Sequence, residues 1–171
     1  MLALCIMASS AIAGAKAHCK SGEIIFFTCP ILKSNKVVSL CGGRDEGTKN
    51  ISWLQYRFGR IGQPELTYPI SKEGSANKFH SNYLTSHESP FEQYDVWFHI
   101  GDFNYSISAL HTGHEPVERF AYVFYEQVDR APNKPPIKLQ GSLSCDGSAE
   151  KLMRKLGELV PQLERESDTV H

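Results

Sequence analysis

The sequence predicts a mainly β protein: an antiparallel sandwich or a small barrel of about eight short strands, followed by one C-terminal helix. Segments rich in β-branched and aromatic residues recur along the chain, and clusters of Gly, Pro, Asn and Asp separate them. After the last of these segments, the leucine spacing changes to that of an amphipathic helix. The 171 residues show neither an internal repeat nor a second domain.

The first seventeen residues are interpreted as a cleaved secretory signal. Residues 2–14 are almost wholly small or apolar, and Ala15-Lys16-Ala17 follows with the A-x-A pattern that signal peptidases read. The run is shorter than the roughly 20 residues that span a bilayer. It lacks the usual basic start, and a buried N-terminal helix is the alternative. Residues 18–171 are then one mature domain, periplasmic or secreted.

The cysteines agree with export. Four of them follow the signal, namely Cys19, Cys29, Cys41 and Cys145. An even number in an oxidising compartment indicates two disulfides, and the absence of a C-x-x-C pair disfavours zinc. A predicted hairpin of residues 23–29 and 36–41 puts Cys29 near its turn and Cys41 near its open end, about 16 Å away. Each of these two therefore pairs with Cys19 or Cys145.

A second hairpin is predicted between Trp53–Phe58 and Glu65–Tyr68. Setting Phe58 opposite Pro64 gives one apolar face, and it gives a charge pair and a polar pair on the other face. A slip by one residue would invert both faces. The expected pairs are Leu54 with Tyr68, Tyr56 with Leu66, Arg57 with Glu65 and Gln55 with Thr67.

A third hairpin is predicted between Tyr94–Ile100 and Phe103–Leu110. Gly101-Asp102 between them suits a two-residue type II′ turn. Pairing Ile100 with Phe103 collects the apolar residues on one face, so the other face is expected to meet solvent. That solvent face carries Asp95, Trp97, His99, Asn104, Ser106 and Ser108.

Three further segments complete the prediction. Arg119–Gln127, apolar on both faces, and Ile137–Ser144 are expected strands, whereas Ser71–Pro90 is expected to be a surface loop, ordered or partly mobile. A helix starting at Ser148 is expected to end near Pro161. Its apolar stripe is expected to pack on the sheet rather than to bind a partner helix.

The charge balance limits the classes of partner. The chain has 18 Lys and Arg against 19 Asp and Glu, a net charge of −1, and its basic residues are scattered. Nucleic acids and anionic membranes normally require a basic surface, so neither is an expected partner. After the signal, no apolar run is long enough to cross a membrane.

The string His111-Thr112-Gly113-His114-Glu115 holds a candidate metal pair, His111 and His114. It does not match H-E-x-x-H, and an ordinary loop between two strands is the favoured interpretation. The chain has no G-x-S-x-G, and disulfide bonding would leave no thiolate for catalysis. We therefore expect a protein without cofactor and without enzymatic activity.

The candidate partner-binding residues are Trp97, His99, Asn104, His111 and His114. A large aromatic side chain on a polar face is typical of an interface, and this is the observation that singles out Trp97. The alternative is that the C-terminal helix or residues 71–90 cover Trp97.

The segments Leu54–Gly59 and Glu65–Pro69, with Glu23–Cys29 and Val38–Cys41 before them, resemble a family of uncharacterised small secreted bacterial proteins. In size, compartment and plan the chain also resembles periplasmic lysozyme inhibitors and immunity proteins against cell-wall toxins. These resemblances imply an exported module that binds, and inhibits, a peptidoglycan hydrolase.

Two other functions are kept as alternatives. A small-ligand carrier would need an interior cavity, lined by Phe98, Tyr105, Phe120 and Tyr122. A metal-dependent hydrolase would use His111 and His114.

Overall fold

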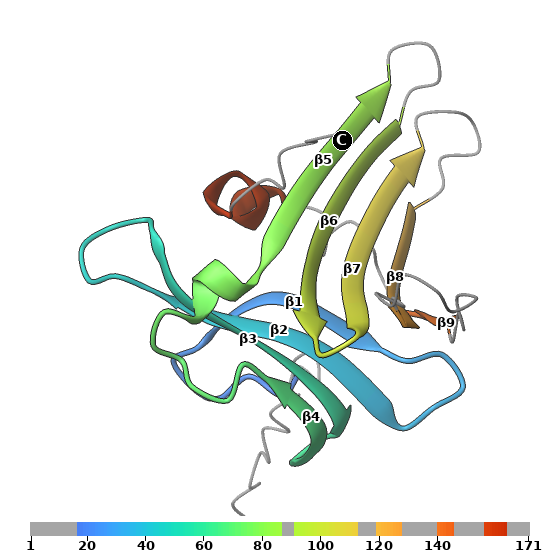
Figure 1. Cartoon of the computed structure of the whole chain (residues 1–171), viewed down its shortest axis with the longest axis horizontal. Helices are drawn as coiled ribbons and strands as arrows, with labels where there is room; N and C mark the ends of the chain where they lie inside the picture. The colour runs from blue at the N-terminus through green and yellow to red at the C-terminus, as the bar shows by residue number, and fades with distance from the viewer. Residues whose placement is uncertain (1–16, 87–90, 113–118, 128–139, 146–155, 164–171) are drawn as a thin grey trace, which may run out of the picture.

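The computed structural model describes residues 17–86, 91–112, 119–127, 140–145 and 156–163 (Figure 1). In these residues, nine strands form two antiparallel sheets, which do not close into a barrel. The predicted mainly β, sandwich-like class is confirmed. The four-stranded sheet consists of β1 (Ile24–Pro30), β2 (Lys36–Arg44), β3 (Ile51–Arg60) and β4 (Gln63–Tyr68). The five-stranded sheet consists of β5 (His80–Ser86), β6 (Phe91–Ile100), β7 (Phe103–Thr112), β8 (Arg119–Gln127) and β9 (Gln140–Ser144).

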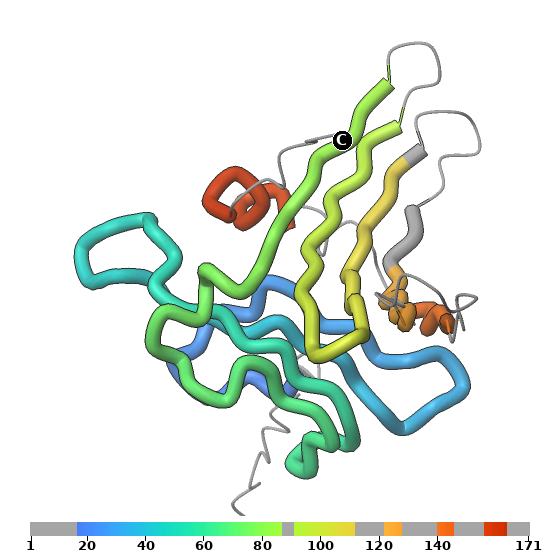
Figure 2. The backbone as a smooth tube through the Cα atoms, viewed as in Figure 1, coloured from blue at the N-terminus to red at the C-terminus, as the bar shows by residue number. Residues whose placement is uncertain are grey.

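Strand order follows chain order in both sheets. The chain leaves the four-stranded sheet after β4, passes through the short 3₁₀ helix η1 (Ser75–Lys78), and continues through the five-stranded sheet (Figure 2). The five-stranded sheet crosses the four-stranded sheet at a steep angle (Figure 1). Because successive side chains of a strand point to opposite faces, each sheet presents one face to the core and one outward.

Aromatic rings fill the centre of the core. Phe98 is fully buried, and its ring centre lies 5.0 Å from that of Tyr56, 4.9 Å from that of Tyr68 and 5.2 Å from that of Phe79. Tyr105 stacks on the remaining side at 5.3 Å. Rings from β3, β4, β6 and β7 therefore join the two sheets, and each buried aromatic side chain contributes up to about 3 kcal/mol.

The two disulfides confirm the predicted partners of Cys29 and Cys41. Cys19 pairs with Cys41, and Cys29 pairs with Cys145. The second bond lies where the end of β1 meets the end of β9, and Leu32 N also donates to the Ser144 carbonyl there at 2.9 Å. This bond therefore joins the two sheets covalently.

The third hairpin has the predicted register. Ile100 pairs with Phe103, and the pairing continues in step through the whole length of β6 and β7. Gly101 has the positive φ, 56°, that the first position of a II′ turn requires. The turn and the alternation of apolar residues specify the same register, which is why local reasoning succeeds here.

The predicted register of the second hairpin is wrong by two residues. Tyr56 pairs with Tyr68, and Arg57 pairs with Thr67 rather than with Glu65. The turn is tighter than expected, and a bulge beside Gly59 leaves one extra residue, Glu65, in β4. A shift of two keeps every side chain on its predicted face, so the apolar face survives although the pairs do not.

The predicted loop Ser71–Pro90 is also wrong in part, because it contains η1 and the strand β5. Ser81 and Tyr83 face inward on this strand, so its sequence lacks a clear apolar alternation. Pairing with β6 along its full length holds it in the sheet. The expected strand Ile137–Ser144 is found as β9, and its first three residues lie outside the described part of the chain.

The C-terminal helix packs on the core, as predicted. Residues 156–159 are helical and continue into the 3₁₀ turn η2 (Val160–Gln162), so the helix changes at Pro161 as expected. Four apolar side chains of this segment are buried, those of Leu156, Leu159, Val160 and Leu163. The predicted start at Ser148 lies outside the described residues. No helix within the described ranges is long and apolar enough to cross a membrane.

Candidate functional site

A shallow groove of about 430 Å³ crosses the outer face of the five-stranded sheet. We call it the outer groove. It is the surface on which the sequence placed its best candidate, Trp97. The residues that line it are Asn82, Gln93, Asp95, Trp97, Asn104, Ser106, Ser108, Tyr122 and Phe124.

Strand register explains the shape of the outer groove. Ser106 on β7 lies between Trp97 on β6 and Phe124 on β8. Two residues further along β7, Ser108 lies between Asp95 on β6 and Tyr122 on β8. Small side chains thus form the floor, and large ones stand on the two flanking strands, whose backbones are about 10 Å apart. The groove is wide enough for one side chain or one ring.

The carboxylate of Asp95 is held in a fixed orientation. Ser108 Oγ donates to its Oδ1 at 2.6 Å, and Gln93 Nε2 lies 2.8 Å from Oδ2 and 3.0 Å from Oδ1. Within the described residues, no Lys or Arg forms an ion pair with Asp95. The groove therefore contains an oriented negative charge that the described part of the chain does not neutralise.

Trp97 is half-buried and is supported from one side. The His80 ring stacks on the indole, with centroids 5.9 Å apart, and the centroids of His80 and His99 lie 6.4 Å apart. Of the two expected alternatives, cover by the C-terminal helix is wrong for the described residues, whereas His80, within residues 71–90, does pack against the indole. Ser81 on the inner face of β5 donates to the Val160 carbonyl, so that segment lies on the opposite side of the sheet.

Asn104 lies at the other end of the outer groove from Asp95. Its Nδ2 is 3.4 Å from Glu126 Oε1. Its Oδ1 is shielded from solvent and has no hydrogen-bond partner within the described residues. An unsatisfied buried acceptor costs about 1–3 kcal/mol, so this end of the groove favours a ligand that brings a donor.

The structure separates His111 from the other predicted partner-binding residues. His111 belongs to β7, opposite Glu92 and Arg119, and strand alternation puts it on the other face from Trp97 and Asn104. His114 lies outside the described residues. The pair therefore remains an untested prediction as a metal site.

Among the described residues, one group has the spacing of metal ligands: Cys19, Glu23 and Cys41. Both sulfurs are already joined to each other in a disulfide. Glu23 is occupied by basic partners. The group therefore lacks free ligand atoms for a metal ion.

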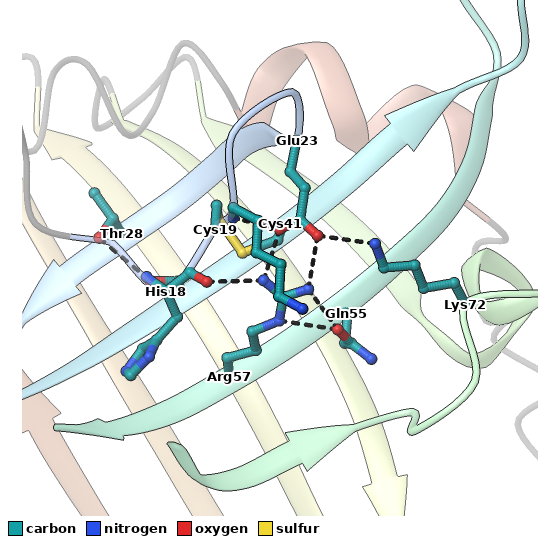
Figure 3. The surroundings of a disulfide bond; sticks show 10 residues. His18, Cys19, Glu23, Thr28, Cys41, Gln55, Arg57 and Lys72 are labelled. Carbon is teal, nitrogen blue, oxygen red and sulfur yellow. Dashed lines mark hydrogen bonds and ion pairs between the residues drawn. A yellow bond between two sulfur atoms is a disulfide. The ribbon is translucent and has the colours of Figure 1, made fainter. Parts of the chain in front are cut away.

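Arg57 and Glu23 form a buried ion pair on the outer face of the four-stranded sheet (Figure 3). Arg57 Nη1 lies 2.6 Å from Glu23 Oε2, and both side chains are about 5% exposed. The remaining donors of the guanidinium reach Gln55 Oε1 and the His18 carbonyl, so all its N–H groups have acceptors. We call this cluster the N-terminal clamp, because it fastens residues 18–23 to the sheet.

Glu23 is as fully bonded as Arg57. Lys72 Nζ donates to it at 2.8 Å, and the backbone N–H of Lys20 donates at 2.7 Å. Burial alone would raise the pKa of Glu23, but these bonds and those from Arg57 outweigh burial and lower its pKa from 4.5 to about 2. The carboxylate stays ionised and saturated, so the clamp is a structural feature.

Of the residues expected to line a carrier cavity, Phe98, Tyr105 and Tyr122 do not surround one space, and the side chain of Phe120 lies outside the described part of the structure. Phe98 is enclosed by other rings, and Tyr122 faces the outer groove on the opposite side of the sheet. An open hollow of about 470 Å³ does lie between the sheets. Of the expected lining residues, Tyr105 borders this hollow, together with Tyr56 and Leu143. The carrier hypothesis in its predicted form is therefore not supported by the packing of these residues.

Of the residues that line the outer groove, the sequence singled out Trp97 and Asn104 as partner-binding candidates, named Tyr122 only for a carrier cavity, and did not single out Phe124. A signal for Tyr122 and Phe124 was present, because residues 119–127 are apolar on both faces although one face of that sheet was expected to meet solvent. Comparison of the chain with protein-family models, with curated proteins and with solved structures gives no match. The outer groove is therefore the candidate functional site.

Proposed function

We propose that this protein is an exported binding module that recognises another protein through the outer groove. Its partner in this proposal is a peptidoglycan hydrolase, which it inhibits. The observation that carries the proposal is a groove with aromatic walls on the outer face of a rigid sheet. Exposed aromatic side chains on a fixed scaffold are typical of protein recognition sites.

The composition of the outer groove supports a protein partner. It combines Trp97, Tyr122 and Phe124 with hydroxyl and amide side chains, and none of its described lining residues is Lys or Arg. The same combination of rigid aromatic anchors with Ser and Asn is enriched in antibody paratopes. The floor belongs to a central strand, so binding needs little ordering and its entropic cost is low.

The two disulfides indicate an oxidising environment outside the cytoplasm. We place the protein in the periplasm or the medium in this proposal. The proposed signal at residues 1–17 and the resemblance to lysozyme inhibitors and immunity proteins support that location. Cell-wall hydrolases act in both places, so a rigid exported binder and such an enzyme would meet.

The test is capture of a hydrolase by the mature, oxidised protein. Residues 18–171 are immobilised and exposed to periplasmic and secreted fractions with measured hydrolase activity. Bound proteins are identified by mass spectrometry, and the captured enzyme is assayed on purified cell walls. We expect one hydrolase, bound stoichiometrically and inhibited.

Two variants make the test specific to the outer groove. Trp97→Ala removes one wall and should lower capture by at least tenfold. Ile70→Ala removes a side chain that is 82% exposed in the segment after β4, and it should leave capture unchanged. Failure to capture a hydrolase from active fractions, or equal capture by both variants, would contradict the proposal.

A further inference from the structure

We propose that the outer groove accepts an arginine side chain of the partner protein, with its guanidinium between the aromatic walls and beside Asp95. This inference rests on the proposed function, because it names the chemistry by which the same groove recognises its partner. Within the described residues, three features carry it: a carboxylate without an ion-pair partner, aromatic walls and an acceptor without a hydrogen-bond partner.

The carboxylates of Asp95 and Glu23 differ in the groups that compensate their charge. Glu23 is neutralised by Arg57 and Lys72, whereas Asp95 receives hydrogen bonds from uncharged groups only, in the described part of the chain. The outer face of this sheet carries two carboxylates, Asp95 and Glu126, and its described positions include no Lys or Arg. A surface of this kind is complementary to a cation.

The orientation of Asp95 suits a ligand that donates hydrogen bonds. Ser108 and Gln93 fix the carboxylate before any ligand arrives. Its two oxygens offer about four acceptor positions, so the three bonds present leave capacity for another donor. A preorganised acceptor binds more strongly than one that has to be ordered first.

The walls favour a planar cation over a compact one. Trp97 stands on one side of the serine floor, and Tyr122 and Phe124 stand on the other. A guanidinium is flat and weakly hydrated, and it stacks on aromatic faces, whereas a lysine ammonium is strongly hydrated. Ser106 and Ser108 leave room between the walls for one such group.

Asn104 provides an acceptor on the other side of the same position. Asn104 precedes Ser106 by two residues on β7, and Ser106 is paired with Trp97. Asn104 therefore lies about 7 Å along the strand from the position of the groove that is beside Trp97. Its Oδ1 has no partner within the described residues. A guanidinium at the Trp97 level therefore has Asp95 on one side and Asn104 on the other, and its N–H groups point in both directions.

The experiment compares two probes of nearly the same shape, one with a cationic guanidinium and one with a neutral ureido group. N-acetyl-arginine amide and the isosteric N-acetyl-citrulline amide are titrated into the isotope-labelled mature protein, and the two indole N–H resonances are followed by NMR. Trp97 reports on the groove, and Trp53, on the other sheet, is the internal control. We expect a saturable shift of Trp97 and of the Asn104 amide with the arginine probe alone.

Matched variants test the role of the carboxylate. Asp95→Asn should weaken binding of the arginine probe at least tenfold, the effect of losing one charged hydrogen bond. Asp102→Asn makes the same change of net charge in the exposed β6–β7 turn and should have no effect. The spectra of both variants should retain the dispersion of the wild-type protein.

Several outcomes would overturn the inference. Equal shifts with citrulline, or an unchanged affinity of Asp95→Asn, would show that charge plays no part. Shifts of Trp97 with N-acetylglucosamine but not with arginine would assign the groove to carbohydrate. A hydrolase captured through Trp97 without arginine binding would refute this inference alone, whereas arginine binding without capture would refute the proposed partner alone.

Discussion

Glu23 shows how a buried carboxylate can be stabilised without an enzymatic role. It accepts bonds from Arg57, Lys72 and a backbone N–H, so its charge is compensated on every side. Removing one partner of such a pair usually costs more than the pair contributes, because the remaining charge stays buried. The clamp therefore holds residues 18–23 in place.

The pH dependence of stability should report on Glu23. Its folded-state pKa of about 2 lies below the ordinary value of 4.5, so the stabilisation is fully present above pH 4.5 and is lost as the pH falls through 2. The loss should reach roughly 3 kcal/mol in the free energy of unfolding. Urea unfolding at a series of pH values measures it.

Glu23→Gln should remove most of this dependence and lower stability at pH 7. The control is Glu65→Gln, because Glu65 forms an ion pair with Lys36 while its side chain is 48% exposed. Exposed pairs contribute about 0–1 kcal/mol, so this variant should keep the wild-type acid profile. An unchanged profile in Glu23→Gln would contradict the assignment.

At the scale of elements, hairpin geometry depends on single glycines. Gly59 has φ 143°, and a Cβ there would lie 2.6 Å from the backbone nitrogen of Glu65. Gly62 also has positive φ, 82°, but nothing lies within 4 Å of its missing Cβ. A side chain at position 59 would cause both backbone strain and a steric clash, whereas a side chain at position 62 would cause backbone strain alone.

Gly59→Ala should therefore destabilise the protein by at least about 2 kcal/mol, because backbone must move to admit the methyl group. Gly62→Ala should cost about 1 kcal/mol, the ordinary penalty for a left-handed alanine. Chemical denaturation of both variants measures the difference. Equal losses would show that the bulge accommodates a side chain.

Local patterns predicted elements where turn and alternation agree. In the third hairpin, Gly101 and the apolar face of β6 and β7 select one register. In the second hairpin, alternation fixed the faces but could not distinguish registers two residues apart, and the bulge decided between them. The strand β5 was missed because its inward positions include Ser81, whose hydroxyl is satisfied by the C-terminal segment.

For the whole molecule, the two disulfides differ in what they join. Cys19–Cys41 closes a span of 22 residues beside one sheet, whereas Cys29–Cys145 closes 116 residues and links both sheets. Loop closure restricts the unfolded chain more when the loop is longer. The inter-sheet bond is therefore expected to contribute more to stability.

Replacing both cysteines of each pair by alanine tests this order. In the chain-entropy description, loss of Cys29–Cys145 costs about 5 kcal/mol and loss of Cys19–Cys41 about 3 kcal/mol. Unfolding is followed under oxidising conditions, with free thiols counted in each variant. The reverse order would show that strain or residual structure, rather than loop length, controls the effect.

The sequence by itself determined the fold class, the face of most strands and the pairs open to Cys29 and Cys41, because alternation and turn chemistry act over a few residues. The tertiary structure alone decided which distant groups meet. Arg57 is 34 residues from Glu23, and the walls of the outer groove come from β6 and β8, which touch only through β7. Such contacts depend on packing and register summed over the whole sheet, and no short stretch of chain encodes them.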